Sequence, residues 1–332
     1  MAHAASTMHE ISATAIDDAV LASSEPVVLR GLVRHWPMVA AALDGRGDAY
    51  LRGFYGGATV GAMLGAPAID GRFFYNDDLT GFNYQAVKVR LDTVLDELQR
   101  QEHAQPPPGI YVGSTTVDTC LPGFREHNDI DLGARDALAS IWIGNRTRIA
   151  AHYDVPDNVA CVAAGRRRFT LFPPEQLKNL YVGPLDFTPA GQAISLVDLK
   201  HPDFTRFPRF DEALAHARVA ELGPGDAIFI PSMWWHHIEA LDAFNVLVNY
   251  WWRDQPDYTD TPTNALLLAM MTMRELAPAQ RAAWQEQFRH YVFEAGDATA
   301  AHIPPAARRI LAPLDDDATR VLRAQLLKKL NR

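Results

Sequence analysis

The sequence predicts a mainly β protein built as a double-sheet jelly roll, with N-terminal α/β elements beside it and a C-terminal helical region. Two observations carry this prediction. Short β-rich runs follow one another between about residues 137 and 253, separated by Gly and Pro and without long helices between them. Strands at this density are typical of a jelly roll. After about residue 260 the apolar spacing becomes helical.

The central region contains the runs expected to form the barrel. Strands are expected at residues 140–143, 159–162, 169–172, 219–222, 227–230 and 244–251. The sequence GPGD at 223–226 predicts a tight turn that leads into the strand at 227–230. We take residues 137–253 as the barrel core of one domain over residues 1–258.

The flanking regions show their own patterns. Residues 25–31, EPVVLRG, predict a strand and then a turn, and residues 91–101 have apolar side chains at helical spacing. Residues 265–276 are nearly continuous in Ala, Leu and Met, and Trp284, Phe288 and Tyr291 recur at helical spacing after Pro278. We assign residues 259–332 to a C-terminal helical region, whose apolar surface, methionines included, either covers the barrel or forms a homodimer.

Composition excludes several classes of protein. The 332 residues are 48% hydrophobic and 21% charged, as in ordinary globular proteins. The net charge of −9 disfavours a nucleic-acid partner, since RTR at 146–148 and RRR at 166–168 are the compact basic clusters within the expected barrel. No signal peptide or long apolar run indicates a membrane, and Cys120 and Cys161 form no disulfide framework. We expect a cytoplasmic protein.

The segment AHYDVPDN at 151–158 carries the main candidate site. On an extended strand residues i and i+2 share a face, so His152 and Asp154 can both bind one metal ion. His236, in the sequence WWHH, would complete the site. Two histidines and one carboxylate, with other positions open, are the ligands of non-haem Fe(II) oxygenases.

The His-x-Asp pattern alone is weak because it occurs three times, at His127, His152 and His201. Pro202 argues against a central strand at the third, and the polar surroundings of His127 indicate a loop. Of the three histidines, only His152 has runs typical of strands on both sides. The residues themselves leave a second interpretation open, in which His152 lies on the surface and Asp154 forms a turn.

Four ordered motifs resemble the cupin-type, JmjC-related 2-oxoglutarate oxygenases, a family that includes asparaginyl hydroxylases. They are NRTRIAAHYDVPDN at 145–158, RRRFTLFPP at 166–174, GPGDAIFIPSMWWHHIEAL at 223–241 and NVLVNYW at 245–251. The resemblance covers most of residues 25–255. It implies Fe(II) bound by His152, Asp154 and His236, with 2-oxoglutarate as cosubstrate, and leaves His237 to packing.

The resemblance also implies residues that hold the cosubstrate. Asn158 and Asn249 match the asparagines beside it, and Tyr111 matches a tyrosine donor. The lysine of the family falls on Arg167, with Arg168 as the alternative, since side chains alternate along a strand. A threonine of the family falls on Ile149, which has no hydroxyl group to donate.

The implied reaction is hydroxylation of a C–H bond on a protein side chain or a small molecule, a methylated lysine included, with release of succinate and CO2. Two alternatives remain: a metal-dependent cupin isomerase or epimerase, and a binding module that has lost catalysis. The tryptophans at 142, 234, 235, 251 and 252 are expected mainly in the barrel core, with one or two lining a substrate cleft. The aromatic and acidic run RFFYNDD at 72–78 is interpreted as an exposed substrate-side segment.

Overall fold

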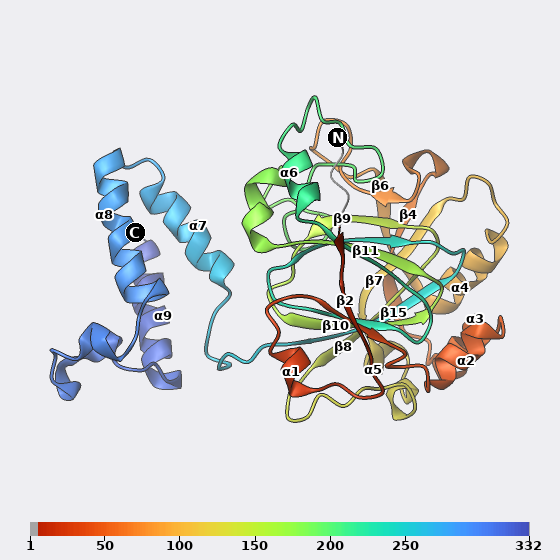
Figure 1. The fold of residues 1–332 in the computed structure, drawn as a ribbon, viewed down its shortest axis with the longest axis horizontal. Helices are drawn as coiled ribbons and strands as arrows, with labels where there is room; N and C mark the ends of the chain where they lie inside the picture. The colour runs from red at the N-terminus through yellow and green to blue at the C-terminus, as the bar shows by residue number, and fades with distance from the viewer. Residues whose placement is uncertain (1–5, 332) are drawn as a thin grey trace. The chain divides into compact units, whose positions relative to one another are not determined.

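The computed structural model describes residues 6–331, which fold as two compact units divided between Arg253 and Asp254 (Figure 1). The first unit contains the strands, and the second contains helices. Within the described residues no helix has the length and apolar character needed to cross a bilayer. The division into an oxygenase domain and a C-terminal region at residue 258 stays a prediction.

The first unit is built from two mixed sheets, which lie one above the other in Figure 1. Among the described residues one sheet has six strands, in the spatial order β1 (Ser6–Thr7), β12 (Arg218–Leu222), β11 (Arg167–Phe172), β14 (Trp235–Ala240), β9 (Arg148–His152) and β5 (Arg72–Phe73). The other has nine, in the order β2 (His9–Ser12), β3 (Val27–Arg30), β13 (Ala227–Ile230), β10 (Asp157–Ala164), β15 (Asn245–Trp252), β8 (Leu138–Gly144), β7 (Gly109–Thr116), β4 (Thr59–Gly65) and β6 (Tyr84–Arg90). The predicted mainly β jelly roll is confirmed.

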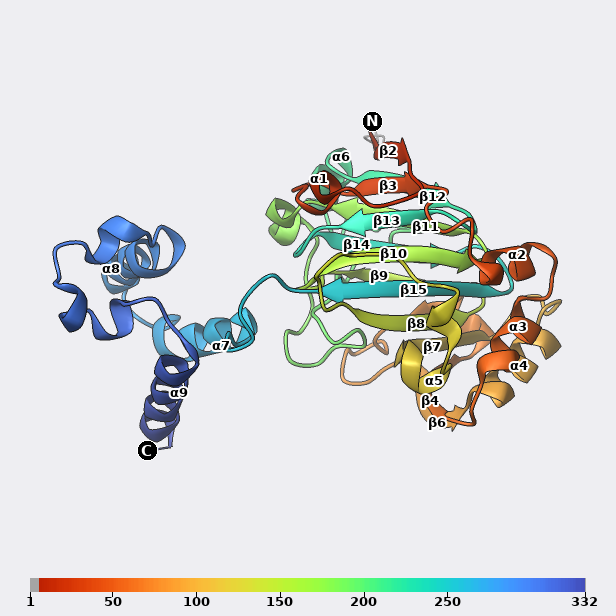
Figure 2. The ribbon, with the colours of Figure 1, turned by 90° about the horizontal axis from the view of Figure 1, so that it is seen from below.

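The two faces of the nine-stranded sheet are covered differently (Figure 2). Its outer face, with Val159 and Cys161 of β10, packs against residues of the N-terminal helices, such as Trp36 and Leu95. Those helices are α1 (Asp18–Leu21), α2 (Pro37–Leu43), α3 (Gly47–Phe54), α4 (Leu91–Arg100) and α5 (Val117–Cys120). Because both faces of the central strands are covered, β10 is apolar at nearly every position instead of alternating.

The inner faces of both sheets form a second core inside the barrel. Ala160 and Val162 of β10 meet Phe169 and Leu171 of β11 there. Side chains two residues apart share a face, so this cluster fixes which residues of each strand point inward. A third cluster, beside α6 (Phe210–Ala215), packs Phe172 and Trp235 under the segment that follows β11.

The C-terminal unit contains α7 (Pro262–Met273), α8 (Pro278–Phe288) and α9 (Asp316–Leu330). Pro262 and Pro278 each occupy the first turn of their helix, where the missing N–H breaks no hydrogen bond. Large apolar side chains remain exposed in this unit, among them Met271, Trp284 and Leu327. Such a surface needs cover, and the homodimer that would provide it stays a prediction.

Gly165 connects β10 of one sheet to β11 of the other, and it has no room for a side chain. Its φ is +67°, and a Cβ atom would overlap the carbonyl oxygen of Phe244 and the side chain of Asn245. Both effects oppose any residue other than glycine. The turn therefore fixes where β11 begins, and so it fixes the position of Arg167, the first residue of that strand.

We expect Gly165→Ala to lower the free energy of unfolding by about 2 kcal/mol or more, from left-handed backbone strain and overlap. Gly223→Ala is the matched control, because a Cβ atom at Gly223 meets nothing within 4 Å and its φ lies outside the left-handed region. Urea unfolding monitored by tryptophan fluorescence measures both. Equal stabilities of the two variants would contradict this account of the turn.

Candidate active site

His152, Asp154 and His236 converge inside the barrel. His152 is the last residue of β9, and it lies directly opposite His236 in the neighbouring strand β14. Asp154 follows two residues after the strand. One ligand atom from each residue lies within 4.8 Å of the others, and Nε2 of His236 is 3.6 Å from Oδ2 of Asp154. This spacing suits three ligands of one metal ion.

Hydrogen bonds orient the three side chains. Nδ1 of His152 lies 2.9 Å from the carbonyl oxygen of Ala150, and Nδ1 of His236 lies 3.0 Å from that of Trp234. A ring nitrogen facing a carbonyl carries the proton, so Nε2 of both rings keeps its lone pair. Metal-binding histidines typically make such a backbone contact through the ring nitrogen that does not bind the metal.

The electrostatic surroundings keep His236 neutral. Burial lowers the pKa of its imidazole, and the neighbouring His152 lowers it further, while Asp154 acts in the opposite direction. A neutral imidazole is the form that binds a metal. Asp154 in turn accepts a hydrogen bond of 3.1 Å from Nε1 of Trp251, which holds its carboxylate in place.

The other His-x-Asp candidates lie elsewhere. His127 follows a short helical turn, Phe124–Glu126, and His201 is largely exposed beside Asp198. His237 points to the opposite side of β14 from His236, where it lies 3.9 Å from Glu239. In the part of the chain that the structure describes, the triad is the one His/Asp/Glu/Cys cluster with metal-binding spacing.

The triad opens into a cavity of about 660 Å³. The residues that the sequence predicted for the cosubstrate all line it, and so does Ile149. Asn249 donates a 2.7 Å hydrogen bond from Nδ2 to Oδ1 of Asn158, so the two amides act as one unit. Burial raises the pKa of Tyr111, which stays a neutral donor. The cavity thus brings Tyr111, Asn158, Arg167 and Asn249 together with the triad.

Arg167 faces the cavity, and Arg168 does not. Arg167 is 2% exposed, and its Nε has no hydrogen-bond partner among the described residues. Burial lowers the pKa of its guanidinium to about 10, which still leaves it charged at neutral pH. Arg168 points outward to Glu221 and Glu239, each at 3.4 Å. A buried, unpaired cation is costly, so the cavity favours an anion beside Arg167.

Several cavity residues were missed by sequence reasoning. They come from the β4–β6 hairpin and from residues 182–195, here called the wall segment. They are Gly61, Ala62, Met63, Ala86, Val87, Lys88, Pro189, Ala190 and Ile194. No motif marks them, because strand pairing and a long irregular loop bring them to the cavity.

The interpretation of residues 72–78 as an exposed segment is wrong for its aromatic part. Phe73, Phe74 and Tyr75 are all buried, at 3–9% exposure, and only Phe73 of these lines the cavity. Arg72 and Phe73 form β5, whose pairing with β9 turns the rings into packed positions. Tyr75 stacks on Phe82, so the run forms part of a small aromatic core.

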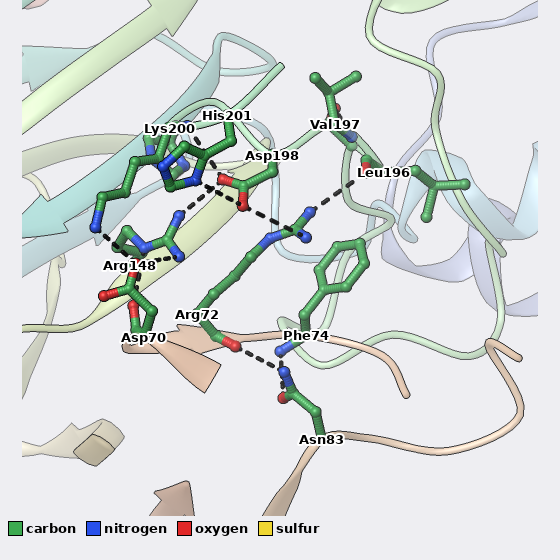
Figure 3. A network of polar contacts seen from close by, with 12 residues as sticks. Asp70, Arg72, Phe74, Asn83, Arg148, Leu196, Val197, Asp198, Lys200 and His201 are labelled. Carbon is green, nitrogen blue, oxygen red and sulfur yellow. Dashed lines mark hydrogen bonds and ion pairs between the residues drawn. The ribbon is translucent and has the colours of Figure 1, made fainter. Parts of the chain in front are cut away.

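A partly buried ion-pair network joins residues just after the wall segment to strand β9 (Figure 3). Arg148, which begins β9, contacts Asp198 at 2.7 Å and Asp70 at 3.0 Å. Arg72 donates to the carbonyl oxygen of Leu196, just beyond the wall segment. The N–H of Ser195 donates to Ala151 beside the triad. Strand β9 therefore holds both His152 of the triad and the end of the wall segment in place.

Comparison with known proteins now identifies the fold family. Residues 13–258, well over half of the chain, match the family described as "Cupin-like domain". The chain belongs to this family. The resemblance of its motifs to JmjC-related cupin-like proteins is confirmed.

Among the relatives of this cupin-like protein are two demethylases. Lysine-specific demethylase 8 of Xenopus tropicalis is 28% identical over 238 residues, which cover 71% of this chain and 49% of the relative. Lysine-specific demethylase JMJ31 of Arabidopsis thaliana is 33% identical over 135 residues, 38% of this chain and 24% of the relative. A tRNA wybutosine-synthesizing protein 5, from Danio rerio, is 36% identical over 105 residues, 32% and 29% of the two chains. The cupin-like protein thus spans about half or less of these curated relatives.

We expect Arg148→Ala to lower the free energy of unfolding by about 2–3 kcal/mol, because it leaves Asp198 without its closest partner in a partly buried network. Arg168→Ala is the control. Its guanidinium is 46% exposed, so its loss should cost less than about 1 kcal/mol. Denaturant unfolding of both variants measures the difference, and a smaller effect for Arg148→Ala would refute the supporting role of the network.

The stability of the metal-free protein should depend on pH through His236. Its pKa is lower in the folded chain than its usual value of 6.5, so the unfolded chain binds the proton first as pH falls. The free energy of unfolding should therefore fall by about 1 kcal/mol or more between pH 7 and pH 5. Urea titrations at both pH values test this, and His236→Gln should flatten the dependence. An unchanged slope in that variant would assign the effect to other groups.

Proposed function

We propose that this cupin-like protein is an Fe(II)- and 2-oxoglutarate-dependent dioxygenase that hydroxylates a C–H bond of a protein side chain or small molecule. The observation that carries the proposal is the pairing of two features in one cavity. A triad with metal-binding spacing lines the same cavity as Arg167, a buried cation with no ion-pair partner among the described residues. The first fits the iron, and the second fits a carboxylate of the cosubstrate.

The donor set supports iron. His152, Asp154 and His236 supply two neutral imidazoles and one carboxylate, and no further acid or histidine of the described chain joins them. Three protein ligands leave open positions for other molecules, as in non-haem Fe(II) oxygenases. Trp251 and the two backbone carbonyls would hold the ligands in position before the metal arrives.

The remaining cavity residues support an acidic cosubstrate. Arg167 would hold the distal carboxylate of 2-oxoglutarate, and a charge-assisted bond of this type contributes about 1.5–3 kcal/mol. Tyr111 lines the same cavity as Arg167 and would offer its hydroxyl as a second donor. Asn158 and Asn249, fixed to each other, would border the cosubstrate from the facing sheet.

With iron bound, the site would use O2 to convert 2-oxoglutarate to succinate and CO2 while a substrate C–H becomes C–OH. The protein's own part is to position and to shield. Leu247, Ile238 and Ile149 line the cavity with apolar surface that restricts water. The β4–β6 hairpin and the wall segment border the space left for the substrate.

The substrate class remains part of the proposal. The names of the relatives refer to lysine demethylases and to a tRNA-modifying protein, so a protein side chain, a methylated lysine or a smaller molecule all remain candidates. A cupin isomerase or a non-catalytic module is less well supported, because neither needs an unpaired arginine beside the triad. Cytoplasmic location and a homodimer through the C-terminal helices belong to the same proposal.

The test is to add Fe(II) and then 2-oxoglutarate without oxygen, following the visible charge-transfer band of the iron chelate. We expect the band in wild-type protein. In Arg167→Ala it should require at least about tenfold more cosubstrate, since the charge-assisted bond is lost.

Arg168→Ala is the matched control, because it removes a neighbouring arginine that points away from the cavity. Its titration should follow that of the wild type. If iron binds to the wild type but no band forms, the oxygenase proposal fails and the isomerase gains support. If both arginine variants behave alike, Arg167 does not hold the cosubstrate.

A further inference from the structure

Trp142 carries a buried hydrogen-bond donor that has no partner. Its indole Nε1 is shielded from solvent, and no acceptor among the described residues reaches it. Buried donors are paired in the great majority of native structures. Trp142 is one of the residues that line the cavity, so a ligand bound there can supply the missing acceptor.

The position of Trp142 places this donor among the cosubstrate residues. Trp142 lies opposite Leu247 in the pairing of β8 with β15, and both line the cavity. Its ring stacks on Tyr111 with a centroid distance of 5.7 Å and meets Trp251 edge-on at 5.9 Å. Two neighbouring aromatic rings therefore restrict the orientation of the indole.

The chemistry of the surroundings selects the acceptor. Arg167 lines the same cavity with an unpaired Nε, so the indole and the guanidinium are both donors without acceptors. One carboxylate has two oxygens and can accept from several donors at once. Ile149, which lines this cavity as well, has no donor to contribute.

We propose that Trp142 donates its indole N–H to the carboxylate of the cosubstrate that Arg167 holds. The inference rests on the proposed function and adds a specificity residue to it. In this arrangement the indole supplies the neutral hydrogen bond that a hydroxyl at Ile149 would otherwise provide. The pocket thus selects keto acids with a distal carboxylate through one charged and one neutral donor.

Trp142→Phe tests this role, because phenylalanine keeps an aromatic ring against Tyr111 and removes only the N–H. Anaerobic titrations of the Fe(II) protein compare 2-oxoglutarate with pyruvate, which lacks the distal carboxylate. We expect about tenfold weaker binding of 2-oxoglutarate to the variant and unchanged binding of pyruvate. Adding Ile149→Thr to this variant should restore part of the affinity for 2-oxoglutarate.

A second measurement needs no variant. In the Zn(II)-loaded wild type, with the indole nitrogens labelled with ¹⁵N, 2-oxoglutarate should move one indole proton resonance downfield. Pyruvate should not. This readout reports on the hydrogen bond itself and does not depend on turnover or on the folding of Trp142→Phe.

The outcomes separate the two proposals. Equal 2-oxoglutarate affinity of Trp142→Phe and wild type, or no selective indole shift, overturns the role of Trp142 and leaves the oxygenase proposal intact. Weaker binding of both keto acids to the variant also overturns it, since a change at the distal carboxylate cannot weaken pyruvate. Absence of a chelate band in iron-loaded wild type overturns both proposals.

Discussion

Strand β14 pairs with β9 on one side and with β11 on the other, and the geometry of the site depends on this shared strand. The pairing with β9 sets His236 opposite His152, and the pairing with β11 sets Ala240 opposite Arg167. A shift of one residue in either register would turn Arg167 or His236 outward. Packing of the inner barrel core, with Phe169 and Leu171 on the same face as Arg167, opposes such a shift.

Among the described residues that line the cavity, Asp154 is the one acidic side chain, and it lies with the cation Arg167 and several neutral donors. In the part of the chain that the structure describes, no acidic side chain pairs with Arg167, while burial favours the neutral form of His236 and Trp251 donates a hydrogen bond to Asp154. The metal-free protein therefore has an electrostatic imbalance that a dicarboxylate and a divalent cation would correct together. This balance relates affinity for one to occupancy by the other, since each reduces the cost of burying its neighbour.

Most of the fold could be predicted from the sequence, and the reasons are local. The β-branched and aromatic run of β15 is typical of a strand, and the sequence GPGD at 223–226 is typical of a tight turn. The choice between Arg167 and Arg168 could not be made, because alternation shows that one points inward without showing which. The place of the β4–β6 hairpin at the cavity and the packing of Phe74 and Tyr75 depend on contacts between residues far apart in the sequence, which no local pattern predicts.

The ion pairs of Arg148 have a consequence for access to the cavity. They join β9, which carries His152, to the segment that begins at Asp198, while Phe187 of the wall segment stacks on Phe82 at 4.7 Å. Because both contacts fasten this side of the cavity, we expect its rim to keep its width. Under the proposed function, a substrate group would have to reach inward on a slender, protruding part of its own molecule. Selection among substrates would then follow from the length and width of that part, before it contacts His152, Asp154 or His236.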